Sequence, residues 1–192
     1  MHPGEILVTA AIAFAVIGLI GYGVSIYNGL IAMKNNIGRS WANIDVLLKQ
    51  RHDELPKLVT TCEQYMKHER AVFDKLSEAR AALMSARSVG ERAEAESMLT
   101  RALGKMFAVA EAYPNLKADQ SFLQLQTRIS QIENQIADRR EFYNDTVTTF
   151  NTRIQQLPDS IVAGWLSFTV AELFKVDESD KQDVEIKFAM TA

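Results

Sequence analysis

The sequence predicts an all-α protein in which an N-terminal transmembrane helix is followed by a long antiparallel, up-and-down four-helix bundle. Three observations predict this fold. Residues 6–33 carry no charged side chain, residues 37–86 hold an apolar stripe, and a second stripe runs from residue 122 to 157. A stripe that repeats every 3.5 residues is typical of a helix that buries one narrow face against other helices.

The uncharged segment is long enough to cross a membrane. Residues 6–26 are mostly apolar, and about 20 such residues span the hydrocarbon core as a helix. A cleaved signal peptide is the alternative, with Gly21-Tyr22-Gly23 as its cleavage site, but its apolar region would be shorter and would follow a basic residue. Residues 1–5 therefore form a short N-terminal segment before a transmembrane helix at 6–33.

Basic residues lie on one side of this segment only. Lys34, Arg39 and Lys49 follow it, and no Lys or Arg precedes it. The positive-inside rule places the N-terminus outside and the large C-terminal domain in the cytoplasm. Small residues at heptad spacing form one face of the span and are candidates for close packing with a second transmembrane helix: Ala11, Ala15, Gly18 and Ser25.

The first stripe predicts one long helix over residues 34–88. Thirteen of its fifteen positions from Ile37 to Ala86 are apolar or aromatic, and only Arg51 and Glu69 break the pattern. Pro56 lies inside this helix, where proline removes a hydrogen bond and causes a kink or a restart. The stripe keeps its phase through Pro56, which favours the kink.

Three more helices are predicted to complete the bundle, which ends at residue 176. A capping box at Ser88 and Glu91 begins a helix over residues 90–113, and a second box at Ser121 and Gln124 begins a helix over residues 120–157. Residues 159–175 are apolar enough to form a fourth, broken helix. Residues 177–192 form an acidic tail in which 184–188 alternate like a short strand.

Composition argues against several classes of function. The formal net charge is −3, and the residues after the span carry 23 acids against 21 bases, so a nucleic-acid partner is not expected. Cys62 falls on the stripe and is interpreted as a small buried residue. His52 and His68 are too far apart on one helix to share a metal, and no nucleophile or phosphate-binding motif occurs. We expect no catalytic residues, no metal site and no cofactor.

Three charged residues occupy predicted core positions: Arg51, Glu69 and Arg139. One interpretation is that their long side chains carry the charges out to water. The other is that Glu69 pairs with an arginine across the bundle, since an unpaired buried charge is strongly destabilising. Such pairs would fix the register of the helices.

Several segments carry the resemblance to a known family. They include Tyr27-Asn28-Gly-Leu30, Trp41-Ala-Asn-Ile44-Asp45, Arg51-His52-Asp53, His68-Glu69, Glu111-Ala-Tyr113-Pro114-Asn115, Glu133-Asn134 and Arg140-Glu-Phe-Tyr143-Asn144. In this order, and over essentially the whole chain, they resemble the LemA family of bacterial membrane proteins. The chain departs from the family pattern at Gln50 and Glu54.

The resemblance implies a transmembrane helix followed by a bundle of four long helices, at the bacterial inner membrane, and no established enzyme activity. We treat the motif residues and Arg139 as structural or contact residues: Trp41, Asp45, Arg51, Asp53, Glu69, Glu111, Tyr113, Arg139, Tyr143 and Asn144.

The predicted function is a non-catalytic scaffold that binds other proteins or itself at the membrane, with Trp165, Phe168 and Phe174 as contact residues of the apolar tail. A lipid-binding or membrane-remodelling protein is one alternative. A ligand sensor or an enzyme with a pocket between the helices is another.

Overall fold

The computed structural model describes residues 3–175, which contain six helices and no strand. The helices are α1 (Pro3–Glu63), α2 (Arg70–Ser85), α3 (Val89–Ala110), α4 (Pro114–Lys117), α5 (Gln120–Arg153) and α6 (Asp159–Trp165). The all-α prediction is confirmed. The predicted acidic tail at 177–192 and its strand-like segment at 184–188 lie outside the described residues.

The chain divides into two compact units, and α1 and α5 each contribute to both. Of the described residues, the first unit comprises 3–46 and 137–172, and the second comprises 47–136 and 173–175. Each unit has its own apolar core, and the two are described separately below.

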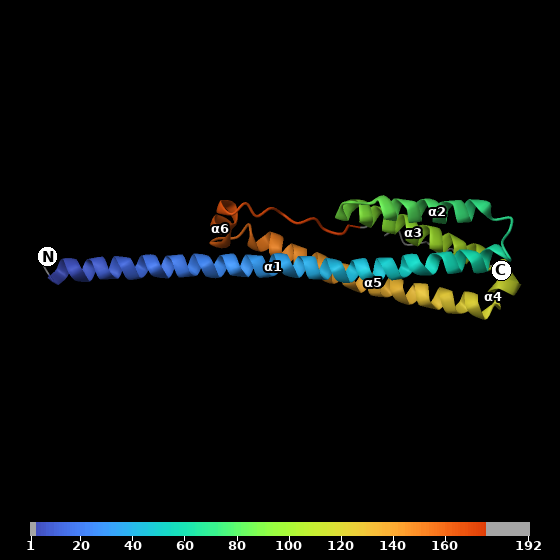
Figure 1. Ribbon diagram of the computed structural model, residues 1–192, viewed down its shortest axis with the longest axis horizontal. Helices are drawn as coiled ribbons and strands as arrows, with labels where there is room; N and C mark the ends of the chain where they lie inside the picture. The colour runs from blue at the N-terminus through green and yellow to red at the C-terminus, as the bar shows by residue number, and fades with distance from the viewer. Residues whose placement is uncertain (1–2, 176–192) are drawn as a thin grey trace, which may run out of the picture. The chain divides into compact units, whose positions relative to one another are not determined.

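The second unit is a four-helix bundle with an up-and-down topology. Its core is contributed by the end of α1, by α2 and α3, and by the start of α5, and α4 adds Leu116. Figure 1 shows that the chain direction alternates from α1 to α2 to α3, and that α5 returns beside them. Short connections between neighbouring helices produce this topology. The bundle prediction is therefore correct in kind.

The four helices of the bundle differ from the predicted four, because the first predicted helix is divided into α1 and α2. Residues 34–88 were expected to form one helix, but α1 ends at Glu63 and α2 begins at Arg70. Two consecutive turns replace the helix: the N–H of Met66 donates to the carbonyl of Cys62, and the N–H of Glu69 to the carbonyl of Met66. The break turns one rod into two antiparallel helices of the same bundle. In contrast, α1 continues through Pro56 without a restart.

The stripe itself is confirmed despite this break. Every one of its fifteen positions from Ile37 to Ala86 is buried or half-buried. The heptad phase therefore predicted which residues face a core, although it could not predict that the helix stops between two of them.

Helix starts follow local capping, with one correction. Ser88 and Glu91 form the predicted capping box at the start of α3. At α5 the predicted box at Ser121 is wrong, because Asp119 Oδ1 accepts hydrogen bonds from the N–H groups of Ser121 (2.8 Å) and Phe122 (3.0 Å). An aspartate at the cap position satisfies N–H groups that the first helical turn leaves unpaired. Pro114 begins the extra helix α4, where its missing N–H is harmless.

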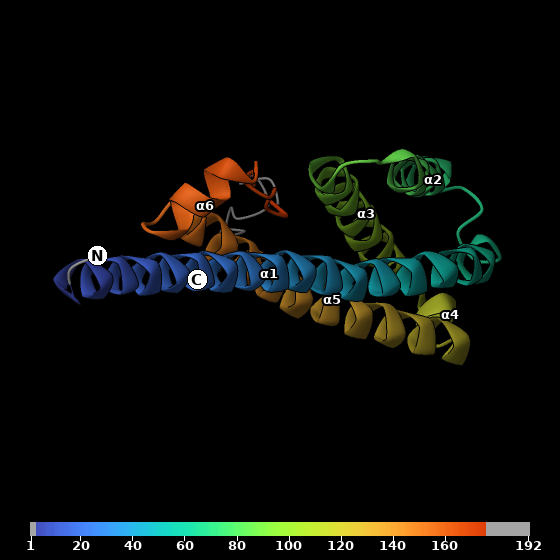
Figure 2. The same cartoon turned by 60° about the vertical axis from the view of Figure 1, so that its left-hand side comes forward.

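The first unit packs α1, α5 and α6 around a smaller core. Ile26 and Leu30 of α1 meet Phe150 and Ile154 at the end of α5 and Ala163 of α6. Figures 1 and 2 both show α6 lying alongside α1. The predicted helices at 120–157 and 159–175 are both shorter in the structure, since α5 ends at Arg153 and α6 at Trp165. Leu157, expected on the buried stripe, is 77% exposed.

The N-terminal part of α1 is apolar and uncovered. Residues 3–22 are all exposed, and α1 is the one described helix long and apolar enough to cross a membrane. Gly23 is the first residue that is not exposed, Ile26 is the first that is buried, and Leu30 is fully buried. The fully uncovered part of the predicted span at 6–33 therefore ends at Tyr22, before the predicted boundary.

Candidate interaction surfaces

Arg51 is the centre of a buried charge cluster in the second unit. Its side chain is 1% exposed and forms an ion pair with the carboxylate of Glu96, which is 3% exposed. Its Nη1 lies 3.3 Å from Glu133 Oε1 and donates a hydrogen bond of 3.3 Å to Thr100 Oγ1. Burial raises the pKa of Glu133, and the charge of Arg51 opposes that shift. The cluster brings one cation and two carboxylates from α1, α3 and α5 together, which fixes the register of these helices.

Glu69 does not pair with an arginine in the described contacts, so that prediction is wrong. Its Oε1 accepts a hydrogen bond of 2.9 Å from the hydroxyl of Tyr113, and this bond raises the pKa of the phenol. A parallel contact joins Tyr65 to Asp119, where the hydroxyl donates to Oδ2 at 3.1 Å. Both bonds tie the turn after α1 to the segment around α4. Two tyrosine–carboxylate hydrogen bonds, Tyr65–Asp119 and Tyr113–Glu69, therefore connect the break between α1 and α2 to the residues on either side of α4.

The chain after α6 is held against α5 by polar contacts in the first unit. The side-chain amide of Asn151 forms two hydrogen bonds with the backbone of Ala171, at 2.9 and 2.8 Å. The hydroxyl of Tyr143 donates to the carbonyl of Glu172 at 2.8 Å, and its ring lies 5.5 Å from that of Trp41. Burial raises the pKa of Tyr143. Trp41 and Tyr143 are therefore structural residues rather than exposed contact residues.

The other predicted site residues lie on the surface or at its edge. Arg139 is exposed, so the first of the two interpretations holds for this residue, and its charge reaches water. Glu111 forms an ion pair with Lys117, and Asp53 lies 3.5 Å from His52 Nδ1. Asp45 is exposed and Asn144 is half-buried.

Within residues 3–175, the structure shows neither an activated cysteine nor a cluster of metal-ligating side chains. Burial raises the pKa of the Cys62 thiol to about 12, and the nearby charge of Asp119 adds to the shift, so the thiol stays protonated and unreactive near neutral pH. No group of three or more metal-ligating side chains occurs within residues 3–175.

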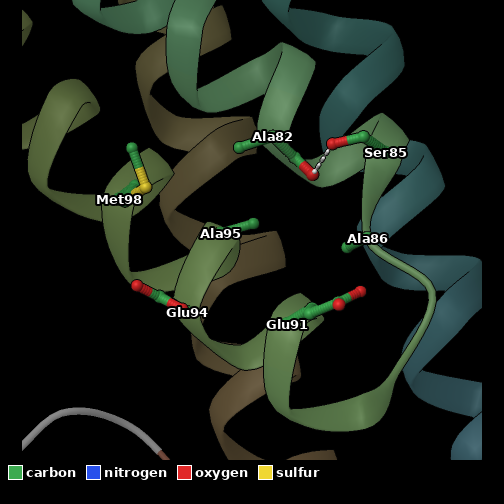
Figure 3. A pocket seen from close by; sticks show the side chains of 7 residues that line it. All are labelled: Ala82, Ser85, Ala86, Glu91, Glu94, Ala95 and Met98. Atoms are coloured by element: carbon green, nitrogen blue, oxygen red, sulfur yellow. Dashed lines mark hydrogen bonds between the residues drawn. The ribbon is translucent and has the colours of Figure 1, made fainter.

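A shallow pocket lies between α2 and α3 in the second unit. Figure 3 shows Ala82, Ser85 and Ala86 on one side and Glu91, Glu94, Ala95 and Met98 on the other. The Ser85 hydroxyl already donates to the carbonyl of Ala82, and Glu91 accepts the backbone N–H of Ser88 in the capping box. Ser85 and Glu91 of this pocket therefore serve the fold, whereas Glu94 is exposed.

An apolar groove lies between α1 and α6 in the first unit. It has a volume of about 640 Å³ and is lined by Leu19, Ile20, Tyr22, Gly23, Val24, Ile26, Tyr27, Pro158, Ile161, Val162, Trp165 and Leu166. Of the three predicted tail residues, Trp165 is 86% exposed, Phe168 is half-buried and Phe174 is 1% exposed. Phe168 packs against Tyr27 and Phe150. Trp165 is the one of these three that is open to a partner.

Sequence reasoning missed Glu96, Glu133 and Asp119. Glu96 lies three residues before Leu99 on the buried face of α3, so extending that face by one step would have placed a carboxylate in the core. A buried arginine on the first stripe requires such a partner. Asp119 precedes Ser121 and is an equally good cap by residue type.

Comparison with known proteins identifies one family. The model of the LemA family matches residues 40–188. Magnetosome protein MamQ 2 of Paramagnetospirillum magneticum is 24% identical over 175 residues, which cover 78% of this chain and 64% of that protein. This chain therefore spans less than two thirds of the length of that relative.

Two further relatives cover similar shares. Protein LemA of Metamycoplasma hominis is 28% identical over 160 residues, which cover 82% of this chain and 73% of that protein. Magnetosome protein MamQ of Magnetospirillum gryphiswaldense is 21% identical over 192 residues, which cover 85% of this chain and 71% of that protein.

Proposed function

The chain belongs to the LemA family, and from this premise we propose that it is a single-pass membrane protein without catalytic activity, whose helical units act as a scaffold or adaptor at the bacterial inner membrane. One observation carries the proposal. The uncovered apolar start of α1 continues without interruption into the part of the same helix that carries Arg51, whose buried charge is paired with Glu96 and Glu133. Two relatives are named as magnetosome proteins.

The proposed anchor is the start of α1. Twenty exposed residues of mostly apolar character are unfavourable in water and favourable in lipid. The cations that follow, Lys34, Arg39 and Lys49, favour a cytoplasmic position for the second unit. A reporter enzyme fused to the C-terminus tests this orientation, and activity confined to the periplasmic side of the inner membrane would contradict it.

The proposed scaffold engages other proteins or further copies of itself. Ala11, Ala15, Gly18 and Ser25 are exposed on α1 and offer a small-residue face for a second α1. We expect Ala15→Cys and Gly18→Cys, in a Cys62→Ser background, to form disulfide-linked dimers in membranes. Ala13→Cys is the matched control, since it places the same change on the opposite face of the same helix turn.

The outcome of this experiment separates two forms of scaffold. Rapid crosslinking at Ala15 and Gly18 but not at Ala13 supports self-assembly through the span. Equal crosslinking at all three positions contradicts a specific α1 interface. The scaffold then depends on other proteins, and crosslinking in cells followed by identification of co-purifying proteins tests that form.

One observation favours the second class of function, lipid binding. Trp165 is 86% exposed and lies on α6, which packs against the same helix that we propose to span the membrane. The sensor alternative has less support. A polar cavity around Glu69 or Arg139 would favour a sensor. Glu69 is instead hydrogen-bonded to Tyr113, and Arg139 is on the surface.

A further inference from the structure

We propose that the groove between α1 and α6 binds one acyl chain of a membrane phospholipid. The inference rests on the proposed membrane anchor, and it adds a defined lipid site to the scaffold. The groove is apolar along its length, and both of its walls belong to the first unit.

The wall formed by α1 belongs to the proposed span. At about 1.5 Å per residue, a helix that begins at Ile6 has crossed about 30 Å of hydrocarbon near Ile26. The groove residues of α1, from Leu19 to Tyr27, therefore lie in the half of the bilayer that faces the helical units. Tyr22 and Tyr27 are 56% and 40% exposed, as expected for tyrosines at the membrane interface.

The wall formed by α6 is open to the same apolar surroundings. Ile161, Trp165 and Leu166 are 52%, 86% and 50% exposed, and all three line the groove. A cluster of this kind is unfavourable in water. Its continuity with the exposed apolar surface of α1 puts it in lipid, where tryptophan favours the interfacial layer.

The charges beyond the groove fit a phospholipid headgroup. No charged residue lies between Ile6 and Met33, and the first charged residue after this segment is Lys34. The Lys34 ammonium group lies 5.9 Å from the centre of the Phe168 ring. The guanidinium group of Arg153 lies close to Gly29, and its Nε donates a hydrogen bond to Asp159. A chain in the groove would therefore place its phosphate near cations rather than in hydrocarbon.

Gly23 provides the test because it lines the groove and has room for a side chain. A Cβ added at Gly23 meets no atom within 4 Å, and the same holds for Gly21, which does not line the groove. Because the Cβ position at Gly23 is open, Gly23→Leu is expected to place a larger apolar side chain in the groove. Gly21→Leu is the matched control, with the same change in size and helix propensity two residues away.

Fluorescence of Trp165 reports on the occupant. The chain has two tryptophans, so Trp41→Phe leaves Trp165 as the only one. The full chain is purified in mild detergent and titrated with phosphatidylglycerol whose acyl chains carry bromine, which quenches tryptophan on contact. We expect Gly23→Leu to raise the mole fraction of brominated lipid at half-maximal quenching by about tenfold, since leucine displaces about two methylene groups of the chain. Gly21→Leu should leave it unchanged.

Two outcomes would overturn the proposal. If Gly21→Leu and Gly23→Leu shift the titration equally, lipid contacts α1 without using the groove. In the second outcome, brominated lipid does not quench Trp165, and Ile161→Cys in a Cys62→Ser background forms crosslinks between two copies of the chain. A second copy, rather than lipid, then covers the groove. Resistance of the wild-type chain to alkaline extraction from membranes is measured separately. Its loss would contradict the membrane anchor itself, whereas its retention with either outcome above contradicts only the lipid site.

Discussion

Each unit has an arginine that pairs with a carboxylate, Arg51 in the second unit and Arg153 in the first, but the two arginines have different surroundings. Arg51 in the second unit is 1% exposed and faces two carboxylates. Arg153 in the first unit is 38% exposed, and its Nε lies 3.1 Å from Asp159 Oδ1. A charged residue within an apolar helix pattern can therefore be either buried and paired or solvated, and the pattern alone does not decide between the two. Burial decides whether it must be neutralised by the fold or can be solvated by water.

The largest expected effect comes from breaking the buried cluster. Glu96→Leu leaves the Arg51 guanidinium with Glu133 as its one remaining carboxylate. Removal of one partner from a buried pair costs about 3–5 kcal/mol, and we expect about 3 kcal/mol because Glu133 remains. Urea unfolding of the full chain in mild detergent, followed by circular dichroism, measures the loss.

A double variant serves as the control for this effect. Arg51→Met with Glu96→Leu removes both buried charges, and such replacements are often neutral or stabilising. We expect the double variant to unfold within about 1 kcal/mol of the wild type. A double variant as unstable as Glu96→Leu would mean that packing, rather than an unpaired charge, causes the loss.

A smaller effect is a change in pH dependence. Because burial raises the pKa of Glu133, its carboxyl group takes up a proton at a higher pH in the folded state than in the unfolded state. The stability that this proton contributes is complete below the ordinary pKa of glutamate and is lost as the pH rises through the folded-state value. Glu133→Gln should remove this fall in stability. Glu94→Gln, on the exposed face of α3, should leave this fall unchanged. Urea unfolding over a range of pH measures both variants. The same dependence of the free energy of unfolding on pH in both would contradict the role of Glu133.

The smallest effect is expected at the exposed pair of the first unit. Asp159→Asn removes the carboxylate beside Arg153, which is 38% exposed. Ion pairs in contact with water contribute about 0–1 kcal/mol and weaken with salt. We expect a change below about 1 kcal/mol in urea unfolding, and less still in about 1 M salt. If Asp159→Asn lowers the free energy of unfolding as much as Glu96→Leu does, the proposed difference between the exposed and the buried arginine is contradicted.

Periodicity predicted the core well, because burial of a helix face depends on spacing alone. All fifteen positions of the first stripe turned towards a core, and so did Leu99, Leu103 and Met106 of α3. The Ser88 capping box was also readable, since it depends on residues three positions apart.

The ends of the helices could not be predicted, because distant contacts set them. Residues 64–69 contain neither glycine nor proline, yet the helix stops there. Hydrogen bonds from Tyr65 to Asp119 and from Tyr113 to Glu69 accompany the turn, and their partners lie more than 40 residues away in sequence. Among the predicted site residues, Arg51 was correctly placed in a core, whereas its partners Glu96 and Glu133 were missed for the same reason.

The overlap between the span and the first core has a mechanical consequence. Ile26 and Leu30 lie on the same uninterrupted helix as the exposed apolar residues before them, and they are buried against α5 and α6. No flexible joint separates the part of α1 proposed to lie in lipid from the part that packs on protein. If α1 spans the membrane as proposed, a tilt or rotation of the helix in the bilayer is transmitted directly to α6, and the first unit is then coupled to the membrane without a flexible linker.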